Sequence, residues 1–182
     1  GTSSVSWPDQ LFDTLKRGDI RQVGYVPDAG HSRLIARCKA DPEIRDVVLT
    51  TEEEGIAMAA GAWLGGQRSA LLMQSSGVGN CVNMLSLIRA CRFPMLMLVT
   101  MRGEWEEFNP WQVPMGSIVE PTLKLCNTHV AKVEQPKATK RKGIAPSLWE
   151  WLQWTHAQYY GNNKGGLSIG QDYALGWDFV YF

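Results

Sequence analysis

The sequence predicts a doubly wound α/β domain with a mostly parallel sheet and helices on both of its faces. Short apolar runs alternate along the chain with segments of helical periodicity, and this alternation is typical of parallel sheets. Each run is too apolar for a half-exposed strand, which indicates burial on both faces. A chain of 182 residues with 45% hydrophobic content is large enough for one such domain.

Strands and helices are expected in alternation through residue 133. The expected strands span residues 22–26, 46–49, 70–74, 95–100 and 129–133. The expected helices span residues 8–17, 32–40, 52–64, 79–90 and 115–126. Residues 1–133 therefore form the main domain, and residues 134–182 are an atypical C-terminal segment that completes or extends it.

The C-terminal segment is rich in tryptophan and tyrosine and has few aliphatic residues. Residues 147–160 have a weak helical pattern, and residues 161–166 are expected to form a turn. Three origins stay open: an altered reading frame, a lineage-specific extension, or an arm that contacts a second copy. If the segment adds no final helix and strand, a sheet edge is exposed, which favours association with another chain.

Charge, hydropathy and cysteine spacing argue against several classes of partner. Eighteen basic and eighteen acidic residues cancel, so the net charge gives no sign of a nucleic-acid or anionic-membrane partner. No apolar run approaches the roughly 20 residues that span a bilayer, and the first residues lack the features of a signal peptide. The four cysteines are widely spaced and have no histidine at zinc-ligand spacing. We expect reduced, mostly buried thiols, no metal site in this chain and a cytoplasmic location.

Three consecutive glutamates, Glu52, Glu53 and Glu54, stand where an expected strand passes into a helix. Open α/β sheets bind ligands at the carboxyl ends of their strands, so a carboxylate here is a candidate functional group. The alternative is that the glutamates complement the positive end of the helix dipole. Spacing alone leaves both interpretations open.

Residues 75–80 form a second candidate segment, because they follow the expected strand 70–74 and precede a helix. Their glycines would let the backbone approach a ligand, and the helix start offers unpaired N–H groups. The segment has neither the Lys-Ser/Thr of a phosphate loop nor the third glycine of a dinucleotide fingerprint. A purely structural turn is the alternative.

Several short motifs lie between roughly residues 8 and 133, and their order and spacing match those of one known protein family. They are Glu52 followed by small residues and Gly61, residues 73–80 with Asn83, and residues 93–98, 102–104 and 112–116. Together they resemble the pyrimidine-binding (PYR) domain of thiamine diphosphate enzymes. The resemblance is to sulfopyruvate decarboxylase α subunits and the matching half of phosphonopyruvate decarboxylase.

The resemblance implies that the chain is the α subunit of a decarboxylase for a small 2-oxo acid, with sulfopyruvate or phosphonopyruvate as substrate and thiamine diphosphate as cofactor. The separation from Gly61 favours Glu52 over its neighbours. Glu52 would hydrogen-bond N1′ of the aminopyrimidine and favour the tautomer that activates the cofactor. The alternative is a non-catalytic PYR-fold subunit that serves assembly or regulation.

The resemblance also implies which other residues contact the cofactor. Ser76, Gly77, Asn80 and Asn83 would lie beside the thiazolium and pyrimidine region of the cofactor. Gln112 matches a family glutamine on an active-site loop.

Asp28 and His31 are further catalytic candidates, since the corresponding turn in thiamine decarboxylases often faces the substrate. They would transfer a proton or recognise a substrate anion. The alternatives are a capping role for Asp28 and a surface position for His31. For Arg102 and Glu104, in the turn before Gln112, the alternative to a functional role is a surface ion pair with each other.

The sequence contains no Gly-Asp-Gly motif. In the family that the chain resembles, the diphosphate and its Mg2+ are held by a separate diphosphate-binding (PP) domain that carries this motif. The resemblance therefore implies a PP-domain β subunit that binds them. Trp105, Phe108, Trp111 and Met115 are more apolar than a free loop needs, which predicts cover by a partner subunit. We expect the isolated chain to be inactive and homo-oligomeric.

Overall fold

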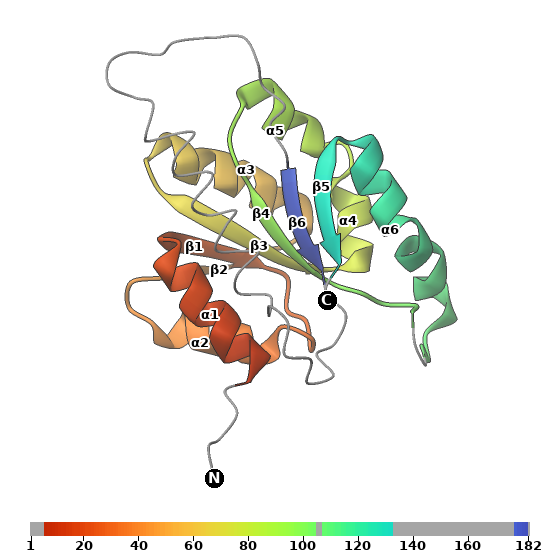
Figure 1. Cartoon of the computed structure of the whole chain (residues 1–182), viewed down its shortest axis with the longest axis horizontal. Helices are drawn as coiled ribbons and strands as arrows, with labels where there is room; N and C mark the ends of the chain where they lie inside the picture. The colour runs from red at the N-terminus through yellow and green to blue at the C-terminus, as the bar shows by residue number, and fades with distance from the viewer. Residues whose placement is uncertain (1–5, 105–106, 133–176, 182) are drawn as a thin grey trace.

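The computed structural model describes residues 6–104, 107–132 and 177–181 (Figure 1). No helix within these ranges is long and apolar enough to cross a membrane. The elements in chain order are α1 (Trp7–Arg17), β1 (Ile20–Tyr25), α2 (Ser32–Ala40), β2 (Arg45–Val48), α3 (Glu52–Leu64), β3 (Arg68–Gln74), α4 (Ser75–Cys81), α5 (Leu85–Cys91), β4 (Leu96–Thr100), the 3-10 helix η1 (Pro110–Gln112), α6 (Val113–Leu125), β5 (Thr128–Lys132) and β6 (Trp177–Tyr181).

The strands form one parallel sheet in the order β2-β1-β3-β4-β6-β5. In chain order the sheet begins with β1, adds β2 on one side, and then continues with β3 and β4 on the other side. This reversal of direction makes the fold doubly wound, so the predicted fold class is confirmed. The expected positions of β1 to β5 are correct to within a few residues at their ends.

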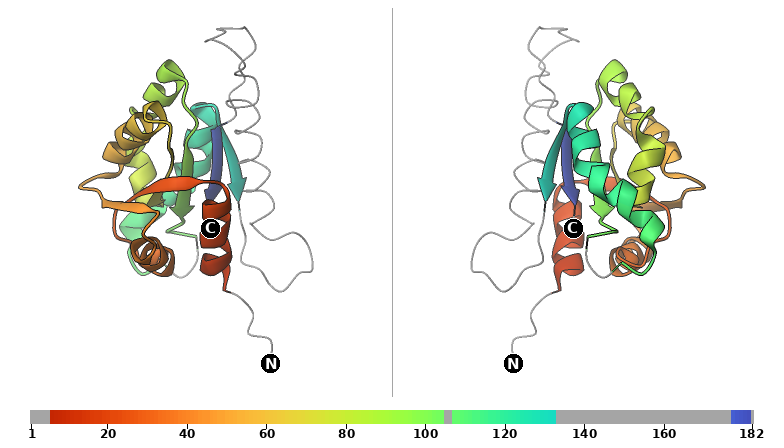
Figure 2. Two further views of the ribbon diagram at one scale, coloured as in Figure 1. Left: turned by 90° about the vertical axis from the view of Figure 1, so that its left-hand side faces the viewer. Right: turned by 90° about the vertical axis from the view of Figure 1, so that its right-hand side faces the viewer.

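Apolar side chains of β3 alternate between two cores, one on each face of the sheet. Ala70 and Leu72 pack with α1 and α2, whereas Leu71 and Met73 pack with α3 to α6. Both side views show α3 to α6 together on one side of β5 and β6 (Figure 2). Burial on both faces explains the continuous apolar runs in the sequence.

The structure corrects two predictions about individual elements. The strand β2 is half exposed rather than buried, with Val48 57% exposed, because it is an edge strand with one neighbour. The single helix expected over residues 79–90 is two helices, α4 and α5. The helix α4 begins directly after β3, so residues 75–80 are helical despite their glycines, because close packing between α4 and its neighbours α3 and α6 overrides local propensity.

The C-terminal strand β6 lies between β4 and β5, and it pairs with β5 from Thr128 opposite Trp177 to Lys132 opposite Tyr181. The sheet therefore ends at β2 and β5, and residues 177–181 supply a strand, which the sequence analysis had left open. The expected helix at 147–160 and turn at 161–166 lie outside the described residues.

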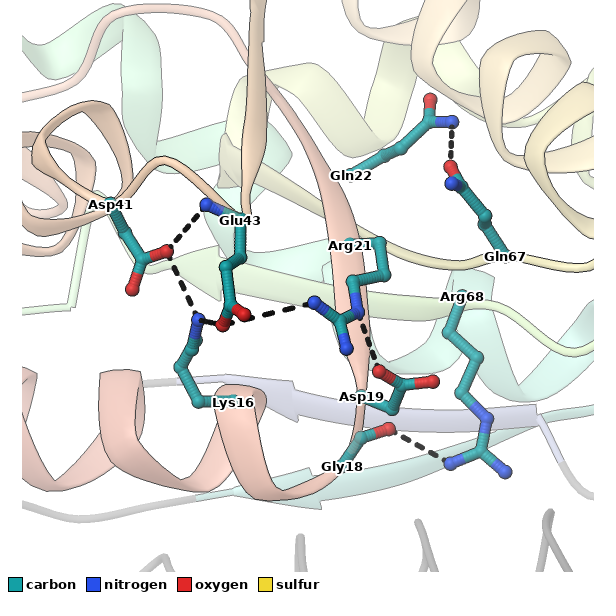
Figure 3. A network of polar contacts seen from close by, with 9 residues as sticks. All are labelled: Lys16, Gly18, Asp19, Arg21, Gln22, Asp41, Glu43, Gln67 and Arg68. Atoms are coloured by element: carbon teal, nitrogen blue, oxygen red, sulfur yellow. Dashed lines mark hydrogen bonds and ion pairs between the residues drawn. The ribbon is translucent and has the colours of Figure 1, made fainter.

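Polar side chains join the turns at the amino ends of β1, β2 and β3 (Figure 3). Lys16 on α1 donates to Asp41 over 3.0 Å and pairs with Glu43, while Arg21 binds Asp19 over 2.6 Å. Asp19, Arg21 and Glu43 border an open groove of about 520 Å3. Exposed pairs such as Arg21–Asp19 contribute only about 0–1 kcal/mol each, so they add little to the stability of the fold.

All four cysteines are free thiols. Cys38 and Cys81 are buried as expected, and burial raises the pKa of each to about 12, so both stay protonated at neutral pH. Cys91 is exposed and Cys126 is partly buried, contrary to the expectation of mostly buried thiols.

We predict opposite effects from alanine at two glycines of α3. A Cβ at Gly55 would lie 2.4 Å from Leu71 Cδ1 and 2.9 Å from Leu49 Cδ1, whereas a Cβ at Gly61 would meet nothing within 4 Å. Gly55→Ala should lower the free energy of unfolding by about 1–3 kcal/mol through overpacking. Gly61→Ala should raise it by up to about 1 kcal/mol, because alanine favours helix. Urea denaturation measures both, and a Gly55→Ala variant as stable as Gly61→Ala would contradict the close packing.

Candidate functional site

A cleft of about 330 Å3 opens at the carboxyl ends of β1, β3 and β4. This edge includes the point between β1 and β3 where the winding direction reverses, which is where open α/β sheets bind ligands. The cleft is lined by Val26, Pro27, Glu52, Gln74, Ser76, Arg102, Asn109, Trp111 and Gln112. The predicted residues Glu52, Ser76 and Gln112 thus meet in one place.

Glu52 is the first residue of α3 and is only 8% exposed. Asn80 Nδ2 on α4 donates a hydrogen bond to Glu52 Oε2 over 2.8 Å. A Cβ at Gly77 would lie 2.5 Å from Glu52 Cγ and 2.7 Å from Oε1. Gly77 therefore leaves the space that the glutamate side chain occupies, and any larger residue there would displace it.

The neighbouring glutamates have different positions and partners. Thr51 Oγ1 donates to Glu53 Oε2 over 2.5 Å, and this hydrogen bond lowers the pKa of Glu53. The backbone N–H of Thr50 donates to Glu54 Oε2 over 2.8 Å. Both residues stabilise the start of α3, as the helix-dipole alternative predicted, and neither lines the cleft.

Arg102 lines the cleft and forms a bidentate ion pair with Glu107. Arg102 Nε and Nη2 donate to Glu107 over 2.7 and 2.6 Å. Glu107 is 7% exposed, accepts from the backbone N–H groups of Gly103 and Asn109, and has its pKa lowered to about 2, chiefly by Arg102. The structure pairs Arg102 with Glu107, so the alternative of a surface ion pair between Arg102 and Glu104 is not the arrangement observed.

Gln112 on η1 is 4% exposed, and its Oε1 has no hydrogen-bond partner among the described residues. An unpaired buried acceptor costs free energy, so a ligand donor in the cleft would stabilise it. Ser75, which the sequence analysis named only as part of residues 75–80, is fully buried, and its Oγ accepts from the backbone N–H of Arg102 over 3.1 Å. This contact holds the Arg102 turn against the start of α4.

Asn83, Phe108 and Met115 lie outside the cleft lining, whereas Trp111 belongs to it. Asn83 is exposed in the turn between α4 and α5, because α4 ends before it, and its cofactor role stays a prediction. Phe108 is 82% exposed and Trp111 is 68% exposed, while Met115 is partly buried. Trp105 lies outside the described residues, and cover by a partner subunit also stays a prediction.

Asp28 and His31 form a buried cluster with Thr100 at the end of β4. Thr100 Oγ1 donates to Asp28 Oδ2 over 2.6 Å, and His31 Nδ1 lies 3.3 Å from the same oxygen but too poorly aligned for a good hydrogen bond. Burial alone would raise the pKa of Asp28, but His31 and Thr100 together lower it to about 2. Asp28 is therefore ionised at neutral pH.

The structure contradicts both alternatives for this pair. His31 is fully buried rather than on the surface, and no side chain caps α2. Asp28 and His31 do not themselves line the cleft, which their neighbour Pro27 does. Their roles in proton transfer or anion recognition stay predictions.

The cleft thus combines a carboxyl group, a buried amide acceptor and a guanidinium. Such a set can share a proton with a ring nitrogen, accept a hydrogen bond from an amino group and attract an anion. Within the described ranges, no group of three or more His, Cys, Asp and Glu side chains could hold a metal ion.

Comparison with known proteins identifies several relatives. Residues 7–113 match the family described as thiamine pyrophosphate enzyme, N-terminal TPP binding domain. Sulfopyruvate decarboxylase subunit alpha of Methanocaldococcus jannaschii is 34% identical over 128 residues, which are 70% of this chain and 76% of that protein. Phosphonopyruvate decarboxylase of Streptomyces viridochromogenes is 39% identical over 110 residues, 59% of this chain and 28% of that protein.

A solved structure shows the same fold. It is a putative thiamin diphosphate-dependent enzyme isolated from Mycobacterium smegmatis, with a TM-score of 0.61 at 14% sequence identity. The alignment covers 98% of this chain and 30% of that one. At this identity the likeness concerns the fold alone.

We predict that Thr100→Val destabilises the protein in a pH-dependent way. The pKa of Asp28 in the fold is below its ordinary value of 3.8, so the associated stability is present above about pH 4 and is lost as the pH falls towards 2. Removing the Thr100 donor should cost about 1–2 kcal/mol at pH 7 and progressively less near pH 2. Urea unfolding at both pH values tests this, with Thr122→Val as the control. A pH-independent loss equal to that of the control would refute the role of the hydrogen bond.

Proposed function

The chain belongs to the thiamine pyrophosphate enzymes as a decarboxylase subunit, and we propose that Glu52 in its cleft activates the cofactor for decarboxylation of a 2-oxo acid. The proposed substrate is sulfopyruvate or phosphonopyruvate, which the names of the relatives support. Because these relatives are decarboxylases, the non-catalytic alternative is not retained.

The observation that carries the proposal is the position of Glu52. It lies in the cleft, with its carboxyl group over Gly77 and one oxygen held by Asn80. An aminopyrimidine offers ring nitrogens and an exocyclic amino group. The carboxyl of Glu52 suits a ring nitrogen, and the unpaired Oε1 of Gln112 suits the amino group, so the residues present fit this part of the cofactor.

Thiamine diphosphate supplies the nucleophilic carbon and the electron sink when it is bound. The chain's own contribution is acid-base chemistry and positioning. Glu52 would hold a proton at the pyrimidine ring nitrogen, while the hydrogen bond from Asn80 fixes the direction of its carboxyl group. Val26 and Pro27 form an apolar part of the cleft lining.

The proposal includes a partner with a PP domain that binds the diphosphate and Mg2+. The sequence has no Gly-Asp-Gly motif of its own, and the relative from Methanocaldococcus jannaschii is named a subunit alpha. Trp111 lines the cleft and is largely exposed, and the nearby Phe108 is more so. Exposed aromatic side chains beside a site are typical of a surface that a partner covers.

We predict that Glu52→Gln lowers the decarboxylation rate by about 100-fold or more while the subunits still assemble, because glutamine cannot exchange the proton. Glu53→Gln is the matched control and should retain activity, since Glu53 bonds to Thr51 outside the cleft. Steady-state assays of both variants with the partner present make the comparison. A large loss in Glu53→Gln with none in Glu52→Gln would show that the wrong carboxylate was chosen.

We also predict that the isolated chain is inactive and sediments as a dimer or larger species. The reason is that it offers the pyrimidine side of the site without a diphosphate motif, and its exposed aromatic side chains remain uncovered. Turnover should appear only when a PP-domain subunit is added. A monomer that decarboxylates 2-oxo acids unaided would overturn the two-subunit proposal.

A further inference from the structure

The lining of the cleft carries one charge of each sign. Among its lining residues Arg102 is the only cation and Glu52 the only acid. Sulfopyruvate and phosphonopyruvate carry a tetrahedral anion at the end opposite the 2-oxo acid group. Within this lining, Glu52 would repel that anion and Arg102 would attract it.

Arg102 is held in place from several sides. Its backbone N–H donates to Ser75 Oγ, and Nε and Nη2 donate to Glu107. The guanidinium carbon lies 5.6 Å from the centre of the Phe108 ring, within cation–π range. This arrangement limits the side-chain freedom that would be lost on binding a ligand.

One part of the guanidinium remains weakly engaged. Its Nη1 lies 3.5 Å from Gln74 Oε1, which is long for a hydrogen bond. Arg102 is 25% exposed whereas Glu107 is 7% exposed, so the cation is the more accessible member of the pair. Glu107 does not line the cleft, but Arg102 and Gln74 do.

We propose that Arg102 is the specificity-determining residue that binds the distal sulfonate or phosphonate of the substrate. The planar guanidinium donates directed, charge-assisted hydrogen bonds to the oxygens of tetrahedral anions. This inference rests on the proposed decarboxylase function and adds the basis for substrate choice. The competing explanation is that the Arg102–Glu107 pair only holds the loop between β4 and η1.

Two variants separate these explanations in the complete enzyme with its partner and cofactor. Arg102→Gln removes both the ion pair and the cation, whereas Glu107→Gln removes the ion pair and keeps the cation. The measurement is the ratio of kcat/KM for sulfopyruvate to kcat/KM for 2-oxobutyrate, which lacks a distal anion. Phosphonopyruvate is tested in parallel to distinguish the two sources of the anion. Arg89→Gln, at an exposed arginine outside the cleft, controls for the loss of one positive charge.

Arg102→Gln should lower the ratio by about 10- to 100-fold, the size expected for a lost hydrogen bond to a charged group. Glu107→Gln and Arg89→Gln should leave most of the ratio intact. The inhibition constant of 3-sulfopropionate should rise by a similar factor in Arg102→Gln alone, which tests anion binding separately from turnover. Sulfopyruvate and phosphonopyruvate are then compared by how much kcat/KM each loses in Arg102→Gln. The substrate with the larger loss carries the anion that the site prefers.

Equal losses of the ratio in Arg102→Gln and Glu107→Gln would show that the pair only holds the loop. An unchanged ratio and an unchanged inhibition constant in Arg102→Gln would also overturn the inference, while leaving the decarboxylase function in place. If the wild-type complex decarboxylates none of the three acids, the proposed function itself fails.

Discussion

The close approach of α3 to β3 and α4 is the constraint on which the site depends. Gly55 lets α3 pack against Leu71, and Gly77 leaves room on α4 for the side chain of Glu52. Both contacts require a residue without a Cβ, even though glycine weakens a helix. The geometry of the packing therefore sets the position of the carboxyl group, and the local helix preference of these segments is secondary.

The two edges of the sheet use charge in different ways. At the amino edge, ion pairs such as Arg21–Asp19 are exposed and contribute little. At the carboxyl edge, the side chains of Asp28 and Glu107 are almost fully buried. Glu107 accepts several hydrogen bonds, whereas Asp28 accepts one from Thr100 and lies beside His31, and the pKa of each is lowered to about 2. Burying a carboxylate is costly unless such partners are present. These partners keep the groups around the cleft ionised and fixed in position.

The cleft belongs to a site that we propose is completed by a second subunit. Glu52, Gln112 and Arg102 would bind the pyrimidine and the distal anion of the substrate, while the diphosphate would lie on the partner. This division would give the chain a role in cofactor activation and in substrate choice. It also provides a reason for the exposed aromatic side chains of Phe108 and Trp111 beside the cleft.

The sequence by itself determined the fold class, the positions of β1 to β5 and the edge of the sheet that carries the cleft, because these follow from local apolar periodicity and from parallel topology. Tertiary structure decided the rest. It set the carboxyl group of Glu52 against Gly77 and Asn80, joined Thr100 to Asp28 across 72 positions, and brought β6 between β4 and β5. It also buried His31 and exposed β2. Such features depend on contacts between residues far apart in the chain, which local patterns do not encode.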